Sequence, residues 1–414
     1  MFNEIKLYTF LYRIKNILII IILFSIPAYS YVINGKVIDQ NYFPVSNITV
    51  YLNNGSSAAT AKDGTFKLSI DKLPYDVYLI DLAKSIGVQY RGLYSYNPEL
   101  TLFGDQPPRN VNSEYIKVEF PAVPRGINAV IKFISSDIFN CKDEHAVSGE
   151  TSKLIKVDWL NSSNSINGRV IYLEKSSSSY GKYMERSYTV LKDFVPQQVK
   201  FDSLGFNQPV GDSYLTIYMP IVSYDKKGFS VYADFLSLNR NAEILLNETE
   251  GDIIFTKVLI PNNLPYSYRL KVMGYGNYKN NSGFAGYYYT YPNSTLNIES
   301  VTPPQLSGPQ DKFYNVNNGT LFSFEWGTGS GIYVLNFHSY NPVGDFYIVT
   351  NETSIRSPLN YCYGVISGDD YSWNVSKYLP YSSVDDFVKI KNFANDVGYK
   401  AISTSETRTF RTKY

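Results

Sequence analysis

The sequence predicts an all-β protein built from tandem β-sandwich domains. Short apolar stretches alternate with polar residues at a period of two, which is the pattern of half-buried strands. The chain holds 39 Tyr and 24 Phe among its 414 residues, and aromatic residues favour strands. Clusters of Asn, Ser, Asp and Gly separate the apolar stretches at short intervals, as turns between sandwich strands do.

Residues 33–70 show the clearest strand pattern, with three apolar stretches and two turns. The residues expected to share the buried faces are Ile33, Gly35, Val37, Ile48, Val50, Leu52, Phe66, Leu68 and Ile70. Asp63 and Gly64 supply a tight turn before the third stretch. This spacing resembles the carboxypeptidase regulatory-like domain, a transthyretin-like β-sandwich. The resemblance implies an architecture and no catalytic activity.

We expect the first domain to cover residues 31–123. Val77–Ile80 continues the strand pattern, and Tyr115–Phe120 alternates again as the strand that closes the sandwich. Pro121 and Pro124 mark the boundary, because the residue before a proline favours extended backbone.

Residues 126–302 form a second all-β region that resembles no family we recognise. Six strands are expected there: Ala129–Phe133, Ile166–Leu173, Tyr214–Met219, Phe229–Phe235, Ile253–Leu259 and Tyr268–Met273. In one of them, the apolar residues Leu215, Ile217 and Met219 alternate with Tyr214, Thr216 and Tyr218. The pattern fits one large sandwich or two small ones.

Residues 303–414 begin with a proline-rich linker, Pro303–Pro309, and resemble a fibronectin type III domain. The residues that carry the resemblance are an early strand with Phe322, Phe324 and Trp326 on one face, and a late tyrosine, Tyr371. The resemblance implies a buried Trp326 and a tyrosine corner at Tyr371.

A helix is expected within residues 382–400, where the last domain departs from the fibronectin pattern. The apolar residues at helical spacing are Val384, Phe387, Val388, Ile390 and Phe393.

Residues 1–30 have the pattern of a secretory signal peptide. A basic stretch precedes an apolar run, Ile17–Ile26, and Ala28 to Ser30 form a small-residue cleavage site. We therefore expect an exported protein, periplasmic, on the cell surface or extracellular, with no membrane insertion after cleavage. An uncleaved anchor is the alternative.

The near-neutral net charge argues against a nucleic-acid partner, and the two cysteines argue against a disulfide-rich fold. The chain has 38 Lys and Arg against 37 Asp and Glu, and removing residues 1–30 leaves a net charge of −1. Nucleic acids require clustered positive charge, so we expect no nucleic-acid partner. Cys141 and Cys362 fall in different expected domains, and two such cysteines make no disulfide framework.

The sequence carries no catalytic or cofactor-binding motif, and we expect neither an enzyme nor a cofactor. The densest group of ionisable residues lies in Asp137–His145, which also contains Cys141, and it lacks the spacing of a zinc site. His338 lies where a strand ends. A pair of carboxylates for glycoside hydrolysis stays open, because such a pair needs no local motif.

One aromatic tract is the candidate ligand site. Tyr287, Tyr289 and Tyr291 follow one another at every second position, so they share one face of a strand. Aromatic rings with a hydroxyl suit stacking on sugars or contact with a protein. The alternative is that these rings pack along the sheet.

Together these features predict a non-catalytic binding, adhesion or scaffold protein at the cell envelope, with a glycan or protein as partner. The alternatives are an accessory part of a carbohydrate-active hydrolase, a cryptic hydrolase of that kind, and a structural assembly subunit.

Overall fold

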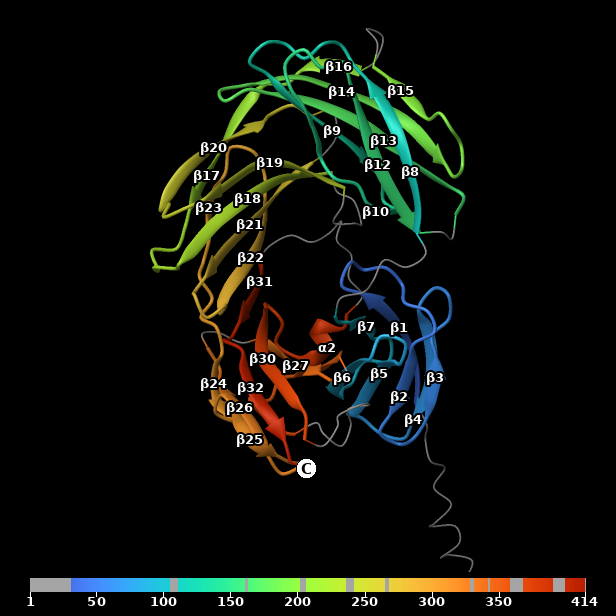
Figure 1. Ribbon diagram of the computed structural model, residues 1–414, viewed down its shortest axis with the longest axis vertical. Helices are drawn as coiled ribbons and strands as arrows, with labels where there is room; N and C mark the ends of the chain where they lie inside the picture. The colour runs from blue at the N-terminus through green and yellow to red at the C-terminus, as the bar shows by residue number, and fades with distance from the viewer. Residues whose placement is uncertain are drawn as a thin grey trace, which may run out of the picture.

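The computed structural model shows an almost entirely β-stranded protein made of four β-sandwich units (Figure 1). It describes residues 31–104, 111–160, 163–201, 206–235, 242–264, 268–327, 331–341, 343–357, 368–389 and 399–413. The expected signal peptide, residues 1–30, and Cys362 lie outside these ranges. Within them no helix has the length and apolarity needed to cross a membrane.

The first unit contains the sheet β4-β1-β7 and the strands β6-β5-β2-β3, which are one end of a fourteen-stranded sheet. Its strands are β1 (Tyr31–Asp39), β2 (Thr49–Leu52), β3 (Ser57–Ala59), β4 (Thr65–Ile70), β5 (Tyr75–Asp81), β6 (Ile86–Leu93) and β7 (Glu99–Leu102). The apolar faces expected within residues 33–70 are all buried, which confirms the period-two pattern. Gly35 lies opposite Phe66, and the ring covers the glycine so closely that an added Cβ would fall 2.2 Å from it.

The second unit contains the sheets β10-β12-β8-β15 and β11-β9-β13-β14-β16. Its strands are β8 (Val111–Glu119), β9 (Asn128–Ile134), β10 (Ile138–Asn140), β11 (Glu144–Ala146), β12 (Ser152–Leu160), β13 (Ser165–Lys175), β14 (Tyr180–Leu191), β15 (Gln198–Lys200) and β16 (Phe206–Pro209). Trp159 and Tyr172 lie in its core.

The strand expected to close the first sandwich belongs to the second unit instead. Residues 115–119 lie in β8, which pairs with β12 and β15. Ile116 and Val118 point into the core of the second unit, and Val123 packs there too. The alternation identified a strand, but the pairing partners decide which sandwich it joins. The limits of independently folding domains stay a prediction.

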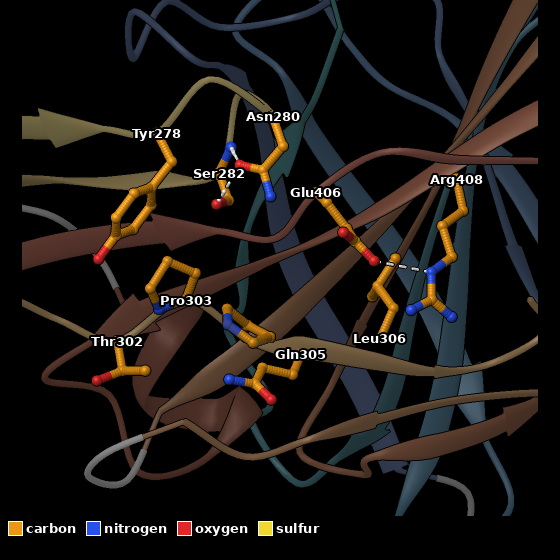
Figure 2. A pocket seen from close by; sticks show the side chains of 10 residues that line it. Tyr278, Asn280, Ser282, Thr302, Pro303, Gln305, Leu306, Glu406 and Arg408 are labelled. Atoms are coloured by element: carbon orange, nitrogen blue, oxygen red, sulfur yellow. Dashed lines mark hydrogen bonds and ion pairs between the residues drawn. The ribbon is translucent and has the colours of Figure 1, made fainter. Parts of the chain in front are cut away.

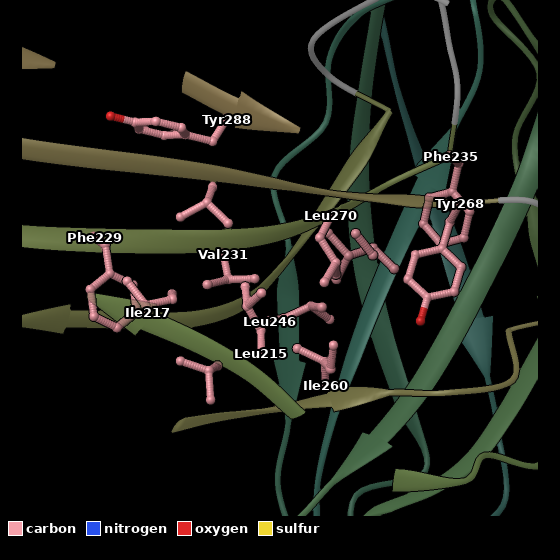
Figure 3. Packing of buried hydrophobic residues seen from close by; sticks show 14 of the residues in the cluster. Leu215, Ile217, Phe229, Val231, Phe235, Leu246, Ile260, Tyr268, Leu270 and Tyr288 are labelled. Carbon is pink, nitrogen blue, oxygen red and sulfur yellow. The ribbon is translucent and has the colours of Figure 1, made fainter. Parts of the chain in front are cut away.

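The third unit contains the sheet β20-β17-β23 and the strands β19-β18-β21-β22, which are the other end of the fourteen-stranded sheet. Its strands are β17 (Asp212–Tyr218), β18 (Lys226–Asp234), β19 (Glu243–Glu250), β20 (Phe255–Pro261), β21 (Arg269–Asn277), β22 (Gly283–Thr290) and β23 (Thr295–Asn297). Leu215 and Ile217 from one sheet meet Phe229 and Val231 from the other (Figure 3). The central region of the chain therefore holds two sandwiches.

The fourth unit contains the sheet β24-β26-β29 and a second layer formed by β25, β27, β28, β30, β31 and β32. Its elements are β24 (Gln305–Gly308), β25 (Phe313–Val316), β26 (Leu321–Glu325), β27 (Ile332–Tyr340), β28 (Val343–Thr350), β29 (Ser354–Arg356), β30 (Asp370–Leu379), α2 (Val384–Phe387), β31 (Tyr399–Thr404) and β32 (Arg408–Thr412). Tyr371 is buried on β30 and its ring stacks on Phe410 at 5.3 Å.

Trp326 was expected in the core of this unit, and this expectation is wrong. Its side chain is 60% exposed, whereas Trp373 on β30 is fully buried. The strand β26 ends at Glu325 and Gly327 takes a left-handed φ of +60°, so Trp326 lies beyond the strand, at the turn, where the alternation no longer applies.

The helix expected within residues 382–400 is a single turn in the described residues, α2, which ends at Phe387, so that Val388 already lies outside it. The turn begins after Ser383, whose side chain accepts a hydrogen bond from the backbone N–H of Asp386. Ile390 and Phe393 lie outside the described residues.

One sheet of fourteen strands connects three of the four units. Its main path runs β19-β18-β21-β22-β31-β30-β27-β28-β6-β5-β2-β3. Antiparallel pairing of β22 with β31 joins the third unit to the fourth, and parallel pairing of β28 with β6 joins the fourth to the first. These two strand pairs join the third, fourth and first units in that order, and the small sheets β20-β17-β23 and β24-β26-β29 lie on the outside (Figure 1).

Candidate functional site

The tyrosine tract lies on β22 and just beyond it. Tyr287 and Tyr289 project from the face of β22 opposite to Phe284 and Tyr288, which fill the core of the third unit. Both are half-buried, whereas Tyr291 follows the last residue of the strand and is 63% exposed. The strand therefore aligns two of the three predicted rings, and the third stands at its end.

Two cations of the neighbouring strand β21 lie over these rings. The guanidinium carbon of Arg269 is 3.9 Å from the ring centre of Tyr289, and Lys271 Nζ is 5.8 Å from that of Tyr287. Such cation–π contacts stabilise both partners. Because Arg269 occupies a face of Tyr289, that ring is less open to a stacking ligand than the sequence pattern suggested.

The same cations belong to a buried network of ion pairs on this face of the sheet. Arg269 Nε lies 2.9 Å from Asp234, and Lys271 Nζ lies 2.6 Å from Glu243. Asp234 and Glu243 are directly opposite one another on β18 and β19. Burial raises the pKa of Glu243 above its ordinary value, although Lys271 opposes this shift. Each carboxylate thus has its own cation.

The second unit covers the free edge of β19 with three charged side chains. Lys132 pairs with Asp143 at 2.7 Å and also donates to the backbone oxygen of Glu243. Asp143 accepts the backbone N–H of Leu245 at 2.9 Å, and Lys175 donates to the backbone oxygen of Leu246. These contacts fix the second unit against the third.

Apart from Tyr291, the most exposed aromatic residues among the described residues of the third unit lie on its other sheet. Tyr214 and Tyr218 project outward from β17 and are 51% and 42% exposed, and Phe255 on β20 is 51% exposed. The rings of Tyr218 and Phe255 lie 5.1 Å apart. Tyr291 lies two residues before Asn293, whose backbone N–H donates to the backbone oxygen of Tyr214 at 3.1 Å. We call Tyr214, Tyr218, Phe255 and Tyr291 the outer aromatic row.

Sequence reasoning did not select three members of this row. The alternation along β17 already separated Tyr214 and Tyr218 from the core residues of that strand. What it lacked was the partner strand, because only the pairing of Tyr218 with Phe255 brings the rings together.

The acidic segment around Cys141 forms no metal site among the described residues. Cys141 is a buried free thiol whose pKa is raised by burial, to about 11. Asp143 is engaged with Lys132, and His145 is exposed on β11. His338 Nδ1 lies 2.9 Å from Asp345 on the neighbouring strand. Nowhere in the described ranges do three or more His, Cys, Asp or Glu side chains come together as metal ligands would.

Comparison with known proteins gives no family for the chain. No protein-family model matches it, and no curated protein does. Among solved structures, the FN1–FN3 domains of chicken CNTN1 share 12% identity, covering 71% of this chain and all of that one, with a TM-score of 0.17. A Ca2+-stabilized ice-binding adhesin of an Antarctic bacterium shares 6%, covering 88% of this chain and 90% of its own, with a TM-score of 0.16.

The major pilin subunit of Bacillus cereus, BcpA, shares 9% identity, covering 66% of this chain and 99% of that one, with a TM-score of 0.13. TM-scores this low mean that the arrangement of the units in this chain does not superpose on that in the three structures. We therefore draw no functional conclusion from these similarities.

Proposed function

We propose that this chain is an exported, modular, non-catalytic β-sandwich protein that binds a glycan at the cell envelope in an adhesion or scaffold role. The proposal includes a carboxypeptidase regulatory-like first unit and a fibronectin type III-like last unit, on the sequence patterns given above. It also includes export, for which the basic and apolar pattern of residues 1–30 is the support.

The outer aromatic row is the observation that carries this proposal. Soluble proteins rarely expose several large rings side by side unless that surface meets a partner. Tyr214 and Tyr218 are four residues apart on one strand, so their Cα atoms are separated by about 13 Å. Rings at this distance can contact successive parts of an extended chain, and the tyrosine hydroxyls can hydrogen-bond to it.

The charge of this surface favours a neutral glycan over a protein segment. Between the rings, the outward side chains of the sheet are Thr216, Lys257, Thr295 and Asn297. Lys257 is the single charged residue among them, and the others are small groups that donate and accept hydrogen bonds. A neutral chain rich in hydroxyl groups matches such a surface, and aromatic rings stack well on the C–H faces of sugars.

Binding to polysaccharide by a variant of the row tests this function. In the variant, Tyr214, Tyr218 and Phe255 are replaced by Thr, which retains the preference for strands. Because all three are exposed, each change should alter the free energy of unfolding by no more than about 0.5 kcal/mol. We expect retention on envelope polysaccharide to be lost while the melting temperature stays nearly constant.

A variant with Tyr287 and Tyr289 replaced by Thr is the matched control on the opposite sheet. It should keep polysaccharide binding and lose some stability, because Arg269 and Lys271 lose their ring contacts. If this control abolishes binding while the outer-row variant retains it, the site lies on the tract itself. Retention only on envelope protein would replace the glycan with a protein partner.

A carbohydrate-active hydrolase is the second candidate, and the opposed pair Asp234 and Glu243 is the observation that favours it. Two carboxylates, one with a raised pKa, are what glycoside hydrolysis uses. Both are bound to cations and buried, which disfavours access by a substrate. Release of reducing ends from polysaccharide by the purified chain, abolished in Glu243→Gln, would establish this activity.

A further inference from the structure

A polar hollow lies where the third unit meets the fourth. Its volume is about 490 Å3, within the range of about 300–1,000 Å3 that is common for small-molecule sites. Three segments line it: the turn between β21 and β22, the connection that leads into β24, and the start of β32 with the residues before it (Figure 2). A ligand in the hollow would contact both units.

One side of the hollow is apolar. Pro304 and Leu306 are buried beneath it, and Pro303 is half-buried beside them. The ring of Tyr278 forms another part of the wall and is held by Tyr224, whose ring centre is 4.9 Å away. A rigid aromatic ring and proline carbons suit the C–H face of a sugar ring.

Amide groups lie in two parts of the wall, with Asn280 on the same turn as Tyr278 and Gln305 between Pro304 and Leu306 at the start of β24 (Figure 2). Asn280 uses its side-chain oxygen to accept from the Ser282 N–H at 3.1 Å and from the Ser282 hydroxyl at 2.7 Å. Its amino group is thus left as a donor. Gln305 is exposed at the rim and offers both a donor and an acceptor. Paired donors and acceptors match hydroxyl groups, which act as both.

The charges in the wall of the hollow balance one another. Arg408 Nε lies 2.9 Å from Glu406, and Arg408 Nη1 donates to the backbone oxygen of Pro309 at 3.1 Å. Figure 2 shows the carboxylate and the guanidinium side by side at one end of the hollow. Because this pair is neutral as a whole and held in place, the hollow offers no net charge to a ligand.

We propose that this hollow is a binding site for one or two neutral sugar residues. Pro303 and the Tyr278 ring would contact the ring carbons, and Asn280, Gln305 and the ion pair would hydrogen-bond to the hydroxyl groups. The source of the sugar rests on the proposed glycan-binding function, since the same envelope glycan would supply it. The hollow and the outer aromatic row are separate surfaces, so each can be tested alone.

Ligand-observed saturation-transfer NMR on the full mature chain tests the proposal. The probes are glucose, galactose, mannose, N-acetylglucosamine and their disaccharides, with glucuronate and glucosamine as charged counterparts. We expect saturation transfer to at least one neutral sugar. Gln305→Ala should weaken its binding about fivefold, the effect of one lost neutral hydrogen bond. Gln305→Trp, which places a bulky indole at the rim and removes the amide, should abolish the signal.

Ser307→Trp is the matched control, because Ser307 is exposed on the same strand and does not line the hollow. It should bind sugar as the natural chain does. Absence of transfer to every neutral sugar would overturn the proposal, as would equal binding by Gln305→Trp. Stronger binding of glucuronate than of glucose would overturn the assignment of a neutral ligand.

The outer-row variant separates the two proposals. If it loses polysaccharide but keeps the sugar signal, both stand. If the natural chain binds polysaccharide and no free sugar reaches the hollow, the proposed function stands and this inference fails. If the chain binds a free sugar in the hollow and no polysaccharide, the site stands and the proposed function fails.

Discussion

Replacing Trp373 by Ala should be the most damaging single change in the fourth unit. Trp373 is fully buried, its ring lies 5.0 Å from Phe322 in an edge contact, and it stacks on Phe337 at 6.3 Å. Truncating a buried large aromatic residue to Ala costs about 3–5 kcal/mol, because contacts are lost and a cavity remains.

Because of the indole nitrogen of Trp373, we expect the cost of Trp373→Ala to lie at the lower end of that range. Nε1 is buried with no hydrogen-bond partner among the described residues, and an unsatisfied buried N–H is itself unfavourable by about 1–3 kcal/mol. Removing it offsets part of the loss. We therefore expect about 3 kcal/mol for Trp373→Ala. Trp373→Phe, which keeps a ring and removes the N–H, should cost less than about 1.5 kcal/mol.

Calorimetric melting of the purified mature chain measures this effect. For a unit of roughly 100 residues, about 3 kcal/mol corresponds to a fall in melting temperature of about 12–24 °C. Trp326→Ala is the matched control, since Trp326 is 60% exposed and its backbone oxygen keeps the bonds from Tyr333 and Lys377. It should change the free energy by less than about 0.5 kcal/mol. Equal losses in the two variants would refute the placement of both tryptophans.

Three other outcomes are expected. Lys271→Met should cost about 3–5 kcal/mol in chemical denaturation, because it leaves a buried carboxylate without its partner, whereas the exposed control Lys279→Met should cost almost nothing. Hydrogen bonds from Lys389 and Ser382 lower the pKa of Asp386 to about 2. The stability that the ionised Asp386 contributes should therefore be lost as the pH falls from about 4 to about 2. In Asp386→Asn, the melting temperature should lack this part of its pH dependence. Sequencing of the exported protein should give an N-terminus near Tyr31, and recovery of the intact chain in membranes would favour an anchor.

The alternation of residues was enough to predict individual strands. In residues 33–70 each apolar residue that shares a face is buried, because the side-chain direction of a strand follows from local geometry alone. The alternation does not predict where a strand ends. Trp326 continues the alternation of β26 in the sequence, yet the left-handed Gly327 turns the chain there.

The sequence pattern could not predict which distant segments pair with one another. Residues 115–119 alternate equally well for either neighbouring sandwich, and only the choice of β12 and β15 as partners assigns them to the second. For the same reason the alternation placed Tyr287 and Tyr289 on one face but gave no sign of Arg269 above one of the rings. Contacts across strands depend on register, which a single sequence does not specify.

The parallel pairing of β6 with β28 determines how the protein would carry tension. The first and last units share this strand pair and a common core, in which Val88 and Leu93 meet Val334 and Val349. A force applied between Tyr31 and the last strand, β32, would therefore pass directly from the first unit to the fourth. The second and third units lie outside that load path. The third unit, which carries the outer aromatic row on its surface, would therefore remain folded while the first and fourth units bear the force.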